Sequence, residues 1–286
     1  MLQDKKIMPP LWLAYPEIDR YSIGWRMGYG ESYKDRFFEW FDALSDEEKK
    51  EYEALFPEPL VWKGWWREED TCELFTHEDY CIPLWRQEGE PRYSAEGLCR
   101  ERDGGKERRI RLFFKNLPVG WEACGNGCFS QWQPQEFLAL DRKYSCMEQF
   151  MMEQKAELFG DEAVRQQILE DTDPKRLKAL GRKVKGFRQD IWDKVKYSVV
   201  LNGNWYKFSQ NRTFREFLLS TGDDILAEAS PYDAVWGIRL SEHAPDAQDP
   251  AKWRGQNLLG FALMEVRDEL RRINAHENLC DWRWDE

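Results

Sequence analysis

The chain has 286 residues, of which 33% are charged and 15% aromatic, and its formal net charge is −11 at pH 7. This aromatic content excludes a disordered chain, and the negative charge argues against a protein whose main role is to coat nucleic acid. No apolar run could cross a membrane, residues 1–10 show no secretory signal, and the seven Cys have no repeated spacing. We therefore expect a soluble, cytoplasmic, globular protein with reduced thiols.

The first part of the chain is acidic and rich in aromatic residues. Two helices are predicted, over Tyr33–Leu44 and Ser45–Phe56, and the second opens with a capping box formed by Ser45 and Glu48. The stretch Val61–Cys99 has no clean period and receives no assignment, although its adjacent Trp pair is more typical of a core or an interface than of a cofactor site.

A charged run at Arg100–Arg109, broken by two adjacent glycines, is the clearest boundary in the chain. We accordingly predict an aromatic-rich N-terminal extension over residues 1–105, a second domain over 106–276 and a C-terminal tail over 277–286. The sequence assigns no chemical role to this extension.

The second domain is predicted to be mainly helical with a little sheet, which places the protein in the α+β class. Short strands are expected at Ile110–Phe114 and Asp224–Ser230, and residues 120–134 are expected to form a loop. Asp173 precedes Pro174 as a helix cap precedes a proline at the first helical position. The helices expected from periodicity and caps are Ser145–Phe159, Asp161–Glu170, Pro174–Lys185, Gln189–Val200, Thr213–Ser220 and Leu258–Arg272.

A basic stretch over Lys175–Lys196 contrasts with the acidic chain. It holds nine Lys and Arg residues against two acids, Asp190 and Asp193. Arg can make bidentate contacts to phosphate, so the stretch is a candidate anion site. Its charge alone favours the simpler interpretation, a solvated helix face.

Two cysteines, Cys124 and Cys128, flank a Gly-Asn-Gly turn and invite comparison with a metal site. A structural zinc site needs four ligands, usually from two close pairs, and the remaining Cys and the three His are scattered. We therefore favour a reduced pair and expect neither a metal nor a cofactor.

Four residues, Glu148, Met151, Met152 and Lys155, share one face of the helix predicted after Ser145. A partly buried Glu148 could activate water or stabilise positive charge on a sugar ring. The alternative is a capping box in which Glu148 only closes the helix start with Ser145. The spacing supports the catalytic and the capping-box interpretation equally.

Two later segments could contact a nucleotide. Asp233, with Trp236 and Gly237, could hold a sugar hydroxyl while the indole stacks on a base, although a turn Asp beside a core Trp is the commoner arrangement. Gln256 and Asn257 precede the last helix, where backbone N–H groups could meet an anion, or Asn257 could be a plain N-cap.

These segments occur in an order that resembles the NADAR superfamily, the YbiA-like N-glycosidases, over residues 110–273. The resemblance rests on a series of matching blocks. In chain order these are Phe129-Ser130 with Trp132, Ser145 to Lys155, Gly181-Arg182 with Trp192 and Lys196, Lys207-Phe208, Leu218 to Asp223, Glu228 to Gly237, and Gly255 to Arg267.

The resemblance implies a mainly helical YbiA-like fold, preceded here by the Trp-rich extension, and hydrolysis of N-glycosidic bonds. It makes Glu148 the catalytic carboxylate, helped by Lys155 and Asp233. The residues it assigns to substrate binding are Phe129, Ser130, Gly181, Arg182, Trp236, Gly237, Gln256 and Asn257, with Gly181 and Arg182 facing phosphate. The chain departs from the family's usual Asn at Gln131 and from its usual His at Gln149, both close to the substrate contacts.

The family's substrates include ADP-ribose attached to guanine and ribosyl-phosphate intermediates of riboflavin synthesis. We expect removal of ADP-ribose from guanine in DNA or RNA, with an ADP-ribosyltransferase toxin as a partner. The riboflavin intermediates are the alternative substrate. The chain could also be a non-catalytic module that binds ADP-ribose, or an interaction protein that uses its aromatic N-terminal segment.

Overall fold

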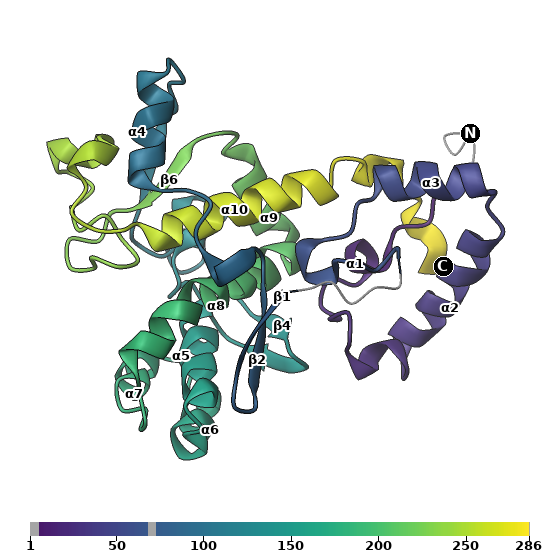
Figure 1. Ribbon diagram of the computed structural model, residues 1–286, viewed down its shortest axis with the longest axis horizontal. Helices are drawn as coiled ribbons and strands as arrows, with labels where there is room; N and C mark the ends of the chain where they lie inside the picture. The colour runs from purple at the N-terminus through teal and green to yellow at the C-terminus, as the bar shows by residue number, and fades with distance from the viewer. Residues whose placement is uncertain (1–5, 68–72, 286) are drawn as a thin grey trace.

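The structure is a computed structural model that describes residues 6–67 and 73–285, so Cys72 lies outside the described residues. Figure 1 shows an aromatic-rich lobe on the right and a larger helical domain on the left. Helix α10 (Leu258–Ile273) runs from the domain toward the lobe, where the chain ends. Within the described residues, no helix is both long enough and apolar enough to span a membrane.

The lobe consists of α1 (Leu11–Ala14), α2 (Tyr29–Asp42), α3 (Asp46–Leu55) and the end of the chain. The predicted capping box of α3 is confirmed, because the Ser45 and Glu48 side chains each accept a hydrogen bond from the backbone N–H of the opposite residue. Helix α2 begins four residues before the predicted start, since Gly28 lies at its N-cap with a φ of 96°.

An aromatic cluster forms the core of the lobe, and the Trp65-Trp66 pair packs against it as predicted. The ring of Trp66 stacks on that of Phe41 with centroids 5.4 Å apart. The C-terminal tail completes the lobe, because Ile7 and Cys280 form a parallel bridge. Residues far apart in the sequence therefore share one core.

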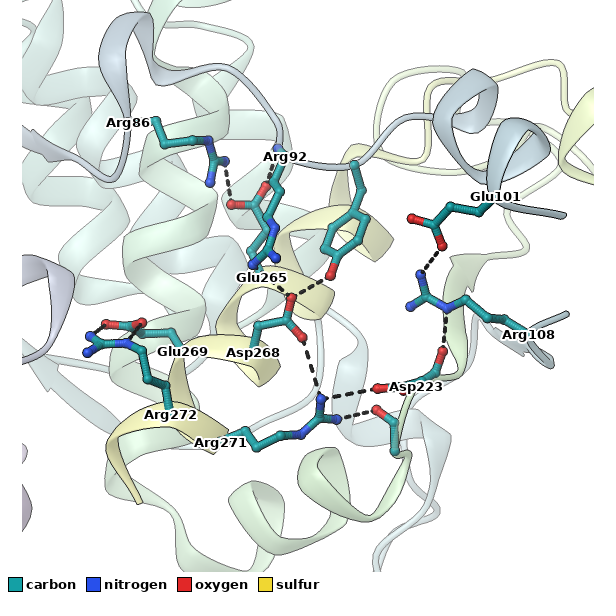
Figure 2. Close-up of polar contacts among 12 residues, drawn as sticks. Arg86, Arg92, Glu101, Arg108, Asp223, Glu265, Asp268, Glu269, Arg271 and Arg272 are labelled. Atoms are coloured by element: carbon teal, nitrogen blue, oxygen red, sulfur yellow. Dashed lines mark hydrogen bonds and ion pairs between the residues drawn. The ribbon is translucent and has the colours of Figure 1, made fainter. Parts of the chain in front are cut away.

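The unassigned stretch before the predicted boundary forms an arm that lies on the domain. It contains an antiparallel hairpin of β1 (Glu73–His77) and β2 (Tyr80–Leu84), followed by α4 (Ala95–Asp103). Figure 2 shows how the arm is attached to α10. The carboxylate of Glu265 accepts hydrogen bonds from the Arg86 guanidinium and, at 2.6 Å, from the backbone N–H of Arg92.

The strands of the domain pair two by two. Strand β3 (Ile110–Phe113) lies parallel to β6 (Ile225–Glu228), and β4 (Phe137–Ala139) lies antiparallel to β5 (Arg142–Tyr144). Because β3 and β6 are parallel, the chain leaves Phe113 and Glu228 at the same end of this small sheet.

Helices make up the rest of the domain, and α8 lies against α5, α9 and α10. Together they confirm the expected α+β, predominantly helical class. Besides α10, the helices are α5 (Met147–Leu158), α6 (Glu162–Glu170), α7 (Pro174–Gly181), α8 (Gln189–Gln210) and α9 (Arg212–Ser220).

Two predicted helix ends are wrong. Helix α8 continues ten residues past Val200 through an Asn-Gly-Asn run that resembles a turn. Gly203 is needed there because a Cβ would lie 2.5 Å from Met147 Cε, and the amide of Asn202 donates back to the Ser198 carbonyl at 2.9 Å. Helix α7 ends at Gly181, four residues before the predicted end.

Candidate active site

Glu148 lies in the first turn of α5 with 3% of its surface exposed. Its Oε2 accepts a hydrogen bond from Trp132 Nε1 at 3.1 Å, while Oε1 is buried without a hydrogen-bond partner among the described residues. Burial raises the pKa of Glu148 to about 7, against the lowering effects of Lys178 and of the bond from Trp132. A buried carboxylate with a free oxygen and a pKa near neutrality is typical of a catalytic site.

The capping-box interpretation of Ser145 and Glu148 is wrong. Cys146 occupies the N-cap position of α5 and its side chain makes no capping hydrogen bond. Ser145 Oγ instead donates to Gln149 Oε1 at 3.0 Å, and the Gln149 amide donates to three backbone carbonyls at the end of α6. Gln149, a departure from the family pattern, therefore anchors α5 to α6, and the Glu148 carboxylate is left for Trp132.

The segment before Trp132 is fixed by a buried lysine. Lys207 on α8 donates to the carbonyls of Cys128 at 2.6 Å and Ser130 at 3.0 Å, and burial lowers its pKa to about 8. Ser130 Oγ in turn accepts a hydrogen bond from the Trp132 backbone N–H at 3.1 Å. The predicted site residue Ser130 thus holds the tryptophan that binds Glu148.

Lys178 on α7 and Arg182, the C-cap residue of this helix, act on the carboxylate. Lys178 and Arg182 are one helical turn apart, and both lower the pKa of Glu148. Lys178 Nζ lies 5.8 Å from the centroid of the Trp132 ring. Several cations of the basic stretch are neutralised locally, since Arg176, Arg188 and Lys196 pair with Asp171, Asp190 and Asp193. The solvated-face interpretation therefore fits the exposed Arg176 and Arg188 but not Lys178 or Lys196, which are partly buried.

A second group of acids follows β6. Glu228 ends the strand, and its Oε2 is buried with no hydrogen-bond partner in the described part of the chain. Burial, together with Asp233, raises the pKa of Glu228 to about 8. Asp233 Oδ1 accepts hydrogen bonds from the backbone N–H groups of Val235 at 2.9 Å and Trp236 at 2.8 Å. Asp233 is therefore a turn Asp that also adds negative charge beside both glutamates.

Trp236 and Gly237 continue this turn. Trp236 is half-buried and packs against the main core, which agrees with the simpler of the two interpretations. A Cβ on Gly237 would lie 2.8 Å from the Glu228 carbonyl oxygen and 3.2 Å from its Oε2. The absence of a side chain at Gly237 thus lets the turn approach Glu228 closely.

Lys155 and Gly181 bind each other rather than Glu148. Lys155 Nζ donates to the Gly181 carbonyl at 2.9 Å and lies 4.0 Å from the Phe187 ring centroid. A Cβ on Gly181 would lie 1.9 Å from Met152 Sδ, so this glycine allows α5 and α7 to pack closely. Both residues make contacts between α5 and the end of α7, and their catalytic and phosphate-facing roles stay predictions.

Three more of the expected substrate contacts are buried or have backbone N–H groups that are hydrogen-bonded within the chain. Phe129 is fully buried in an aromatic core that includes Phe113 and Phe208. The backbone N–H groups of Gln256 and Asn257, predicted to meet an anion, donate to the carbonyls of Ala234 and Gly237. Gln256 itself is exposed.

Asn257 occupies the N-cap position of α10 with a φ of 55°, but its side chain does not cap the helix. Its Oδ1 accepts from the Glu228 backbone N–H at 3.0 Å, and its Nδ2 donates to the Leu226 carbonyl at 2.9 Å. The plain N-cap interpretation is therefore wrong, and Asn257 fixes the end of β6 that carries Glu228.

The thiols of Cys124 and Cys128 are free and lie close together. A hydrogen bond from Cys128 lowers the pKa of Cys124. Within residues 6–67 and 73–285, no cluster of three His, Cys, Asp or Glu side chains could hold a metal ion.

The sequence profile of the NADAR domain family matches residues 120–271, more than half of the chain. The chain belongs to the NADAR domain family. The matched residues include Glu148, Trp132, Lys178 and Glu228, so the site described above lies within the NADAR domain.

Several relatives of this NADAR domain are named N-glycosidases, hydrolases that act on N-glycosyl bonds, which confirms the expected enzyme class. An N-glycosidase of Acanthamoeba polyphaga mimivirus is 43% identical over 146 residues, 49% of this chain and 86% of that protein. An N-glycosidase of Nostoc punctiforme is 33% identical over 148 residues, 51% of this chain and 87% of that protein. The chain is also similar to the solved structure of Escherichia coli YbiA. The match covers 61% of this chain and 89% of the YbiA chain, with 26% identity and a TM-score of 0.47.

Proposed function

We propose that this NADAR protein hydrolyses the N-glycosidic bond of a phosphorylated ribosyl substrate, and that ADP-ribose on guanine in nucleic acid is that substrate. The observation that carries the proposal is the Glu148 carboxylate, which is buried, has one oxygen without a hydrogen-bond partner among the described residues, and is favoured in its ionised form by Lys178 and Arg182. N-glycosidase relatives support the bond type.

The chemistry follows from the charge that develops at the sugar. Cleavage of a ribosyl–nitrogen bond passes through an oxocarbenium-like state with positive charge on the ring. Ionised Glu148 stabilises that charge and takes a proton from the attacking water, whose oxygen forms the new bond to the anomeric carbon. The base leaves with the electron pair of the broken bond and accepts a proton.

Lys178 on α7 and the C-cap residue Arg182 supply the binding energy. Lys178 and Arg182 are one turn apart, a spacing at which neighbouring phosphate oxygens can contact both. Binding of remote phosphates orients the ribose against Glu148 and thereby lowers the barrier. An ADP-ribosyltransferase that modifies guanine is the class of enzyme that would supply this substrate.

The test is release of free ADP-ribose from guanine-ADP-ribosylated DNA. Wild type should release it, and Glu148→Gln should lose release by a factor of about 10² or more. Glu170→Gln, which changes an exposed glutamate at the end of α6, is the matched control and should retain activity.

Two results would point to a different function. Cleavage of ribosyl-phosphate intermediates of riboflavin synthesis, without action on DNA, would transfer the proposal to the small metabolites. Tight ADP-ribose binding by wild type and by Glu148→Gln, with no turnover of either substrate class, would instead indicate a non-catalytic ADP-ribose-binding module.

A further inference from the structure

Glu228 is a second buried carboxyl group that interacts electrostatically with Glu148, and the mechanism above does not use it. The charged groups that act on it come from three separate parts of the domain: Asp233 in the turn after β6, Lys178 on α7 and Glu148 on α5. Its Oε2 is buried and unpartnered within the described residues, like Oε1 of Glu148. Two incompletely bonded carboxyl groups thus share one electrostatic environment.

We propose that Glu228 is the general acid of the reaction, and that its carboxyl group donates a proton to the nitrogen of the departing base. The inference rests on the proposed function and completes its proton balance. As the carbon–nitrogen bond breaks, its electron pair goes to the base, which takes the Glu228 proton. Glu148 takes the proton released by the attacking water, and both carboxyl groups return to their starting states through solvent.

The backbone around Glu228 is held on both sides, as a proton donor requires. Asn257 Oδ1 accepts from the Glu228 backbone N–H, and the Glu228 carbonyl accepts from the Ile238 N–H at 2.9 Å. Gly237 leaves room for this approach, since a Cβ there would lie 3.2 Å from Glu228 Oε2. Asn257 and Gly237 are therefore positioning residues for the carboxyl group.

The charged neighbours of the two glutamates favour a proton on Glu228 over one on Glu148. Burial and the negative charges of Asp233 and Glu148 raise the pKa of Glu228 to about 8, with Lys178 opposing the shift. The pKa of Glu148 is raised to about 7, and Arg182 as well as Lys178 lowers it. Two carboxyl groups that repel each other lose their protons in separate steps, so over an intermediate pH range the pair holds one proton, as general acid–base hydrolysis of a glycosidic bond requires.

The experiment is a pH profile of kcat/KM from pH 5.5 to 9.5 for release of ADP-ribose from guanine-ADP-ribosylated DNA. Wild type should give a bell-shaped profile whose two apparent pKa values belong to the coupled pair. Glu228→Gln should lower the maximum by about 10² to 10⁴ and remove the alkaline limb while retaining the acidic limb.

The outcomes separate the two proposals. A wild-type profile without an alkaline limb, or an alkaline limb that persists in Glu228→Gln, would overturn the assignment of Glu228 and leave the hydrolase in place. Absence of release by wild type, from the DNA and from ribosyl-phosphate intermediates alike, would refute the proposed function and this assignment with it. The wild-type profile tests the inference even if the variant does not fold.

Discussion

Replacing Glu148 with Gln should stabilise the fold above neutral pH while it removes activity. Burial raises the pKa of this carboxyl group from 4.5 to about 7. A raised folded pKa gives a contribution to stability that is complete below the unfolded pKa and is lost as the pH rises through 7. At about 1.4 kcal/mol per pKa unit, the ionised carboxylate costs the fold ~3 kcal/mol at pH 8 and under ~1 kcal/mol at pH 5.

Urea unfolding followed by tryptophan fluorescence measures this difference, since the chain has 15 Trp. We expect the free energy of unfolding of Glu148→Gln to exceed that of wild type by about 2–3 kcal/mol at pH 8, and by less than about 1 kcal/mol at pH 5. An equal difference at both pH values would refute the reasoning, because the effect would then not arise from ionisation of this group.

Glu153 provides a control on the same helix. It is fully buried, but its Oε1 is paired with Arg165 at 2.7 Å and Arg142 at 3.2 Å. Removing one partner of a buried ion pair costs about 3–5 kcal/mol. Glu153→Gln should therefore be less stable than wild type at both pH values, the opposite sign to Glu148→Gln at pH 8.

Three further changes test the supports of the site. Trp132→Phe removes the hydrogen bond that lowers the pKa of Glu148, so the acidic limb of the kcat/KM profile should move up by about one pH unit. An unmoved limb would show that Trp132 does not influence the titration. Gly181→Ala should cost about 1–3 kcal/mol in urea unfolding, with partial recovery when Met152→Ala is added, because the new Cβ meets Met152 Sδ. Lys207→Met should lower the free energy of unfolding by about 1–3 kcal/mol and expose residues 124–132 to proteolysis, because two backbone carbonyls lose their hydrogen-bond donor. Unchanged resistance to proteolysis would show that the lysine does not fix this segment.

Local sequence rules predict helix starts better than helix ends in this chain. Asp173, the predicted cap of α7, accepts hydrogen bonds from the first turn of that helix, and Asp161, the first residue of the next predicted helix upstream, does the same for α6. The end of α8 is not predicted because the second half of this helix is buried on nearly every side, so its sequence lacks an amphipathic period. The hairpin β1–β2 is not predicted because Pro83 and the polar residues between the strands interrupt the alternation of apolar and polar residues that is typical of strands.

Some residues of the candidate site can be identified from the sequence, whereas others require the structure. Glu148 can be identified from the resemblance, and its helix from periodicity, but the choice between a cap and a free carboxylate requires the position of Trp132. Lys178 lies on α7 four residues before the C-cap residue Arg182, a spacing that is present in the sequence but not distinguishable within the basic stretch. Glu228 cannot be assigned from the sequence, because only the packing of α5, α7 and β6 places it near Glu148.

The treatment of buried acids elsewhere strengthens the assignment of the two glutamates. Both carboxylate oxygens of Glu265 and of Glu269 accept hydrogen bonds, several of which Figure 2 shows, and those of Glu153 do the same. The fold thus has the means to satisfy a buried carboxylate. Glu148 and Glu228 each keep an unbonded oxygen within the described chain, and Lys178 acts on both. Unpaired buried acids are costly to the fold, so their occurrence together at one place is better explained by a ligand that completes their bonds than by imperfect packing.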